Sequence, residues 1–136
     1  MFEIREHTAD LALHVAAADF PGLCAEAVRG LLAVLVENPE AVRERAQETV
    51  EIQGRDEAYL LVDLLDEVLY RFAVRHQLVA RCTLEPRPDG LRATLYGEPV
   101  DPARHRLVHE VKAITYHELA VRVTPSGRET TLVLDI

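Results

Sequence analysis

Hydrophobic and polar residues alternate with a period of two in several short segments, a pattern that predicts strands with one buried face. Near the N-terminus, Leu11, Leu13 and Val15 form such a face, so Asp10 is expected on the opposite one. The same alternation places Asp135 away from the leucines of the last segment. Strands are predicted within residues 11–15, 47–53, 78–84, 91–95, 111–116, 119–123 and 131–136.

Two longer segments repeat their hydrophobic residues at helical spacing instead. The first runs from Asp19 to Glu37, with Asp19 as its expected N-cap, and the second from about Asp56 to His76. The segment Pro86–Gly90 is rich in turn-forming residues and predicts a hairpin between two strands, whereas Gly97–Pro102 reads as a loop. We therefore expect an α+β fold in which a mixed, largely antiparallel sheet packs against two main helices.

The chain has the size and composition of one globular domain, residues 1–136. Its 15 Lys and Arg residues against 23 Asp and Glu residues give a net charge of −8. A protein that grips nucleic acid by neutralising phosphates needs an excess of basic residues, so RNA or DNA is expected to be at most an indirect partner. The N-terminus lacks the features of a signal peptide and no apolar run is long enough to span a bilayer, which predicts a cytoplasmic protein without a membrane partner. Cys24 and Cys82 lie in apolar patterns and are expected to be buried thiols.

Two acids mark the ends of the strand pattern. If the strands of Asp10 and Asp135 are neighbours, the two carboxylates can converge and favour a hard divalent cation such as Ca²⁺ or Mg²⁺. Ile136 follows directly and offers its carbonyl and an α-carboxylate as further oxygen ligands. The alternative is that both acids are simply solvated at strand ends.

Lys112 is the only lysine among the 15 basic residues. A lysine in an arginine-rich chain is a candidate for a position that needs a compact point charge, facing a carboxylate or a phosphate. On composition alone, chance usage on a surface strand is the favoured explanation.

Histidines give weaker signals. His105 and His109 have the i,i+4 spacing of metal ligands on a helix, but neither His109 nor His117 completes an HExxH motif. Structural or hydrogen-bonding roles are therefore favoured for the histidines, while His7 either supports Asp10 from behind or caps a turn. Motifs of nucleophilic hydrolases and of nucleotide-binding loops are absent, so the sequence favours a binding or accessory protein over an autonomous enzyme.

Four segments form a combined pattern that extends over essentially the whole chain. They are His7-Thr8-Ala9-Asp10, Gly97-Glu98-Pro99-Val100-Asp101-Pro102-Ala103-Arg104-His105, Val111-Lys112-Ala113-Ile114-Thr115-Tyr116-His117 and Leu134-Asp135-Ile136. In order and spacing, these segments resemble the archease family. Two departures fall at the last hairpin: Glu118 stands where the family usually has glycine, and residues 128–130 replace a segment that often carries tryptophan.

The resemblance implies a function in RNA repair. Archeases are accessory proteins of the RtcB-type tRNA-splicing RNA ligase and promote its guanylylation and multiple turnover without being ligases themselves. The resemblance further implies a divalent cation, calcium in the family, held by Asp10, Asp135 and Ile136, and an activating role for Lys112. Asp101 and His105 match motif positions to which it assigns no role.

Two other classes of function stay open at this point. A general chaperone-like modulator of other nucleic-acid-modifying enzymes would use the acids only for solubility. A metal-dependent hydrolase would need a general base and a substrate pocket, which the sequence does not indicate.

Overall fold

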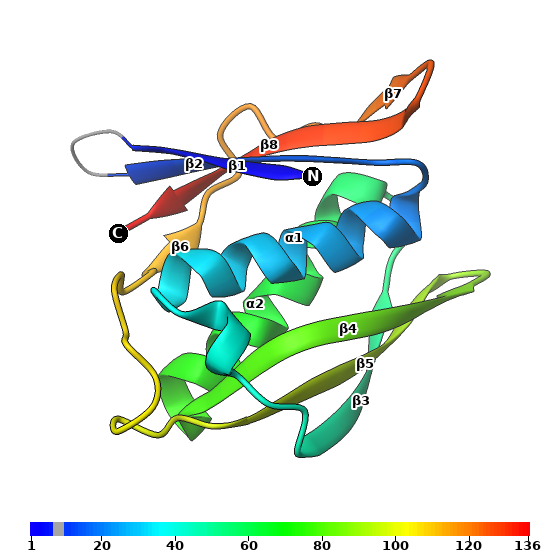
Figure 1. The fold of residues 1–136 in the computed structure, drawn as a ribbon. Helices are drawn as coiled ribbons and strands as arrows, with labels where there is room; N and C mark the ends of the chain where they lie inside the picture. Colours follow the sequence, from blue (N-terminus) through cyan, green and yellow to red (C-terminus); the bar gives the residue numbers. More distant parts are fainter. Residues whose placement is uncertain (7–9) are drawn as a thin grey trace.

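The structure is a computed structural model that describes residues 1–6 and 10–136. Figure 1 shows two β-sheets with both α-helices between them. The helix α1 (Phe20–Leu35) packs against strands of both sheets, and α2 (Glu57–Arg75) packs beside it. The first sheet has the order β1-β2-β8-β6, with β7 also paired to β8, and the second has the order β3-β5-β4. The strands are β1 (Phe2–Glu6), β2 (Asp10–Ala17), β3 (Ala46–Gln53), β4 (Gln77–Arg87), β5 (Gly90–Pro99), β6 (Ala113–Ile114), β7 (Arg122–Thr124) and β8 (Gly127–Asp135).

The α+β class and the two main helices are confirmed. The first helix begins at its predicted cap, since the Asp19 carboxylate accepts a hydrogen bond from Gly22 N at 2.8 Å. The second begins near its predicted start, and there the Asp56 carboxylate accepts a hydrogen bond from Tyr59 N at 3.1 Å. After α1 the chain continues into a short 3₁₀ helix, Pro39–Ala41. All strand pairs in the described residues are antiparallel, and they form two sheets because both faces of the helix layer are apolar and need cover.

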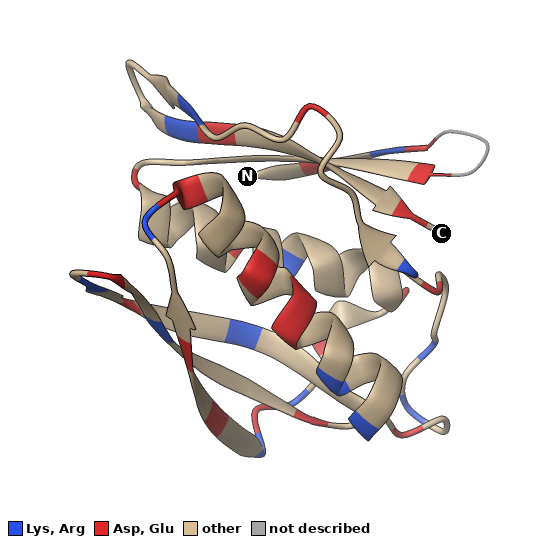
Figure 2. Ribbon diagram, turned by 180° about the vertical axis from the view of Figure 1, so that it is seen from behind, with Lys and Arg blue, Asp and Glu red and all other residues tan. Residues whose placement is uncertain are grey.

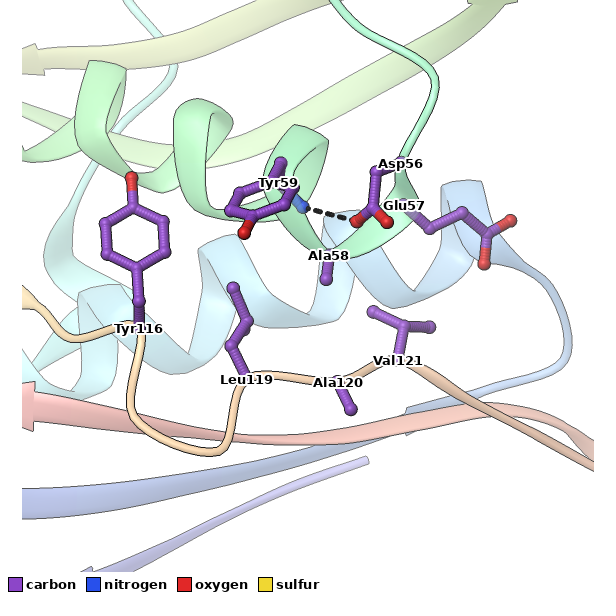
Figure 3. A pocket seen from close by; sticks show the side chains of 8 residues that line it. All are labelled: Asp56, Glu57, Ala58, Tyr59, Tyr116, Leu119, Ala120 and Val121. Atoms are coloured by element: carbon purple, nitrogen blue, oxygen red, sulfur yellow. Dashed lines mark hydrogen bonds between the residues drawn. The ribbon is translucent and has the colours of Figure 1, made fainter.

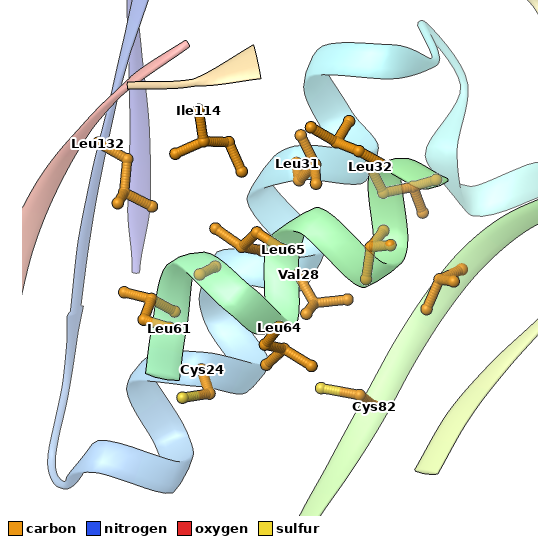
Figure 4. Close-up of a cluster of buried hydrophobic side chains, with 14 of the residues drawn as sticks. Cys24, Val28, Leu31, Leu32, Leu61, Leu64, Leu65, Cys82, Ile114 and Leu132 are labelled. Atoms are coloured by element: carbon orange, nitrogen blue, oxygen red, sulfur yellow. The ribbon is translucent and has the colours of Figure 1, made fainter. Parts of the chain in front are cut away.

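The hydrophobic core fills the space between the two sheets and surrounds the helices (Figure 4). Cys24 of α1 and Cys82 of β4 are both free and buried in it, as predicted. Burial raises the pKa of both thiols, that of Cys82 to about 12. No helix in the described residues is long and apolar enough to cross a membrane.

The segment between β5 and β8 differs most from the prediction. Gly97–Pro99, expected in a loop, belongs to β5, and the predicted strands at 111–116 and 119–123 shrink to β6 and β7. Glu118 interrupts this segment with a left-handed backbone, φ 52°. A side chain is strained in that conformation, and glycine is the residue that adopts it freely.

Candidate functional site

Asp10 and Asp135 lie directly opposite each other on the neighbouring strands β2 and β8. Side chains at directly opposed positions of an antiparallel pair point to the same face, with Cβ atoms roughly 4.5–5.5 Å apart. The adjacent Leu11 and Leu134 are fully buried on the other face, so the two acids lie on the outer face of this sheet. The condition set by the sequence, that these two strands be neighbours, is thus met.

The chemistry of this acid pair suits a hard cation. Opposed like charges repel each other, and neither carboxylate has a basic side chain within 4.0 Å in the described part of the chain. Two carboxylates, with the main-chain oxygens of the adjacent Ile136, would offer an all-oxygen donor set, which Ca²⁺ and Mg²⁺ prefer. Within residues 1–6 and 10–136, no three His, Cys, Asp or Glu side chains converge as a metal site, so the set contains two aspartates and no third side-chain ligand.

The backbone of Lys112 is hydrogen-bonded to the backbone of Asp135, one member of this acid pair. Its N–H donates a hydrogen bond to Asp135 O at 2.7 Å, immediately before β6 begins. The register places Ala113, not Lys112, directly opposite Asp135. The ammonium group is exposed and forms no ion pair within 4.0 Å in the described residues, so the pairing with a carboxylate of this patch that the sequence suggested is not made.

This freedom sets Lys112 apart from the arginines. Every arginine except Arg43 has a carboxylate within 4.0 Å in the described structure. The charge of Lys112 is therefore available to an external group, whereas nearly all the arginines pair with carboxylates of the protein itself.

A second group of sequence candidates forms a buried polar network around Glu98, which is 2% exposed. Its carboxylate accepts hydrogen bonds from Arg43 N at 2.7 Å, from the Arg104 guanidinium at 2.6 Å and from His105 Nε2 at 2.9 Å. Burial on its own raises the pKa of Glu98, but the hydrogen bonds from Arg104, Arg43 and His105 outweigh it and lower the pKa to about 2.

His105 is a structural residue of this network. Its Nδ1 accepts a hydrogen bond from Asp101 N at 2.8 Å, so the proton of the neutral ring lies on Nε2 and is donated to Glu98. Both ring nitrogens are therefore engaged. The segment of His105 and His109 is not helical, and the two residues do not form the metal pair that their spacing allowed.

Asp101 holds the turn that carries His105. Its carboxylate accepts hydrogen bonds from Ala103 N at 3.0 Å and from Arg104 Nε at 3.1 Å. Asp101 and His105, the motif residues without an assigned role, thus stabilise a loop and lie apart from the acid pair. His7, expected to support Asp10 or to cap a turn, lies outside the described residues.

Three members of the network were missed by the sequence reasoning: Glu98, Arg104 and Asn38. Asn38 is buried after α1, donates to Arg104 O and accepts from Arg106 N, both at 2.8 Å. Glu98 and Arg104 stand within the quoted Gly97–His105 motif, so the signal was present, but alternation alone gives no reason for a glutamate to be buried.

Known proteins resemble the whole chain. Residues 2–136 match the sequence pattern of the archease protein family (MTH1598/TM1083). The archease of Pyrococcus abyssi is 35% identical over 132 residues, covering 93% of this chain and 92% of that protein, and the archease of Pyrococcus furiosus is 32% identical over 131 residues with the same coverage.

Two solved structures share the fold. The solution structure of Methanobacterium thermoautotrophicum protein 1598 has a TM-score of 0.79 and 25% identity, covering 99% of this chain and 98% of that one. The crystal structure of a Thermotoga maritima archease, described as a possible chaperone, has a TM-score of 0.72 and 18% identity, covering 100% of this chain and 98% of that one.

Proposed function

Because the chain belongs to the archease family, we propose that it is an accessory protein that activates an RtcB-type tRNA-splicing RNA ligase and is not an enzyme itself. It promotes guanylylation of the ligase, and so its multiple turnover, through a patch formed by Asp10, Asp135, Ile136 and Lys112. The RNA belongs to the ligase, in agreement with the net charge of −8 of the accessory protein.

The observation that carries the proposal is the register of β2 and β8, which opposes Asp10 to Asp135 beside the backbone of Lys112. A divalent cation, calcium in the first instance, would be held by the two carboxylates and an oxygen of Ile136 and would relieve their repulsion. Lys112 supplies a free ammonium group next to the cation for a phosphate or carboxylate of the ligase. Docking of this patch stabilises the guanylylation-competent state of the ligase by binding it more tightly than the resting state.

The test is guanylylation and multiple turnover of the ligase with the wild-type protein and with Asp10→Ala, Asp135→Ala and Lys112→Ala. Each variant is expected to lose most of the stimulation while remaining folded. Glu3→Gln is the matched control, because Glu3 is an exposed acid on β1 of the same sheet. Full stimulation by all three patch variants would refute the proposal.

A chaperone-like role toward other nucleic-acid-modifying enzymes is the second candidate, supported by the description of the Thermotoga maritima relative as a possible chaperone. Calorimetric titration with CaCl₂ separates the two. A site that Asp10→Asn abolishes and Glu3→Gln retains supports the metal-dependent activator, whereas the absence of any site favours the chaperone-like role.

A further inference from the structure

Three of the four tyrosines are exposed around one helix. Tyr59 and Tyr70 of α2 are 57% and 48% exposed, and Tyr116, in the loop after β6, is 54% exposed. Between the two helical tyrosines stand Asp63 and Asp66 at the spacing of a single helical face. We call Tyr59, Asp63, Asp66 and Tyr70 the α2 stripe. Large aromatic residues left in solvent on one surface are typical of a protein-binding site.

The α2 stripe is flanked by two hollows. On one side, the rings of Tyr59 and Tyr116 lie 5.8 Å apart at the mouth of a pocket of about 390 Å³ that Asp56 and Glu57 also line (Figure 3). On the other side, Asp63 and Asp66 border a hollow of about 270 Å³ together with acidic neighbours. Both hollows therefore offer space for a side chain. In the first, Glu57 already pairs with Arg128, whereas the second is lined by Asp63 and Asp66, which form no ion pair in the described residues.

The α2 stripe itself carries no basic side chain, although Arg71 and Arg92 pair with Glu67 and Glu51 beside it. Figure 2 shows acidic residues along the exposed side of α2, with arginines only near its C-terminal end. In the described residues, neither Asp63 nor Asp66 has a basic group within 4.0 Å, although nearly every arginine of the protein is paired. Burial, with the like charges of Asp63 and Glu67, raises the pKa of Asp66. A cationic group placed beside Asp63 and Asp66 would therefore reduce the repulsion between these carboxylates.

The protein itself shows what fills such a surface. On the second sheet, the Arg81 guanidinium lies 4.1 Å from the centre of the Tyr96 ring and donates a hydrogen bond to the Glu44 carboxylate at 2.7 Å. Arginine in this way satisfies a tyrosine face and a carboxylate at once, through cation–π attraction and a charge-assisted hydrogen bond. In the α2 stripe, the Arg75 guanidinium already lies 5.6 Å from the centre of the Tyr70 ring. In the described residues, Tyr59, Asp63 and Asp66 have no arginine against them in this way.

We propose that the α2 stripe is the docking surface for an arginine-rich segment of a protein partner. Guanidinium groups of that segment stack on Tyr59 and pair with Asp63 and Asp66, and the pocket beside Tyr116 receives one further side chain. The surface requires neither a divalent cation nor Lys112, so it is separate from the acid pair at Asp10 and Asp135.

Fluorescence anisotropy with a labelled peptide of alternating arginine and glycine tests the proposal at low salt. Asp63→Asn combined with Asp66→Asn is expected to weaken binding about tenfold, from two lost ion pairs. Glu37→Gln combined with Glu40→Gln, two exposed acids after α1, removes the same charge and is expected to weaken binding less than about twofold. Equal losses in the two double variants would overturn the docking site.

Two further measurements separate specific docking from attraction by net charge. Tyr59→Leu leaves the charge unchanged and is expected to weaken binding about threefold through the lost stacking. The matching lysine–glycine peptide is expected to bind several-fold more weakly, because an ammonium group cannot make the planar fork. An unchanged affinity in either experiment would refute the arginine specificity.

The position of the site is read from amide NMR shifts. The arginine peptide is expected to perturb α2 and residues near Tyr116. Shifts centred elsewhere would contradict the proposal, as would a calcium ion or a single-stranded RNA that perturbs the stripe as strongly as the peptide does. The assay contains no ligase, so its failure and that of the proposed function are distinguishable.

Discussion

Replacing Glu98 by glutamine tests whether the buried network holds the fold together. The carboxylate receives three N–H donors, from Arg43 N, Arg104 and His105, with almost no access to water. Glutamine keeps the shape but leaves one acceptor oxygen and turns an amide N–H₂ toward groups that also donate. At least one donor then loses its partner, and the Arg104 charge loses one of its two carboxylate partners and keeps only Asp101.

The expected cost is large relative to the stability of a domain. Removing one partner of a buried charged pair typically costs about 3–5 kcal/mol, against a total of about 5–15 kcal/mol. We take about 3 kcal/mol for Glu98→Gln, because Arg104 is partly exposed and recovers some hydration. For 136 residues, the unfolding entropy is about 290 cal/mol/K, so the melting temperature should fall by about 10 °C.

Urea unfolding followed by circular dichroism measures this cost directly. With a slope of about 2 kcal/mol per M, the midpoint should fall by about 1.5 M while the slope stays constant. The control is Glu51→Gln, whose carboxylate forms an exposed ion pair with Arg92 and should change stability by less than about 0.5 kcal/mol. A midpoint for Glu98→Gln within the range of the control would show that the network is not structural, contrary to our reasoning.

Three other predictions concern pH, thiol reactivity and backbone strain. Because the pKa of Glu98 is lowered to about 2 in the folded state, its contribution to stability is complete above about pH 4.5 and is lost as the pH falls toward 2; acid titrations should therefore be flatter for Glu98→Gln than for the wild type. Cys24 and Cys82 should resist a thiol-specific reagent in the native protein and react only as urea unfolds it, and fast labelling before unfolding would contradict their burial. Glu118→Gly should stabilise the protein by about 0.5–1 kcal/mol in thermal unfolding, whereas Glu118→Ala, which keeps the Cβ, should not; equal effects would exclude strain as the cause.

Regular periodicity made most of the fold predictable. Both helices and the β4–β5 hairpin follow their residue patterns because each buries one face against a continuous core, so local alternation and tertiary packing agree. The region between β5 and β8 was harder. Here residues are held by isolated contacts, such as the bridge between Val36 and Leu107, that no short-range period encodes.

The candidate site also contains residues whose positions the sequence predicted and residues whose positions it did not. Alternation predicted that Asp10 and Asp135 lie on the outer faces of their strands. That these two strands are neighbours could be learned only from the structure. Glu98 shows the opposite situation. Its burial depends on three donors outside the strand pattern: Arg43 N, which is distant in sequence, and Arg104 and His105 in the loop after β5. A burial that is decided by long-range hydrogen bonds leaves no periodic trace.

The loop between Val100 and Lys112 connects the buried network to the acid pair. It is fixed at its start by Val100 N, which donates to His76 O at 2.8 Å, and at its end by Lys112 N, which donates to Asp135 O at 2.7 Å. In between, the ring of His105 and the backbone of Val108, whose N–H donates to Leu35 O, attach it to the second sheet and to α1. Because the segment forms almost no sheet of its own, these attachments determine where Lys112 emerges. The Gly97–His105 motif therefore helps to position Lys112, because it anchors the chain that leads to this residue.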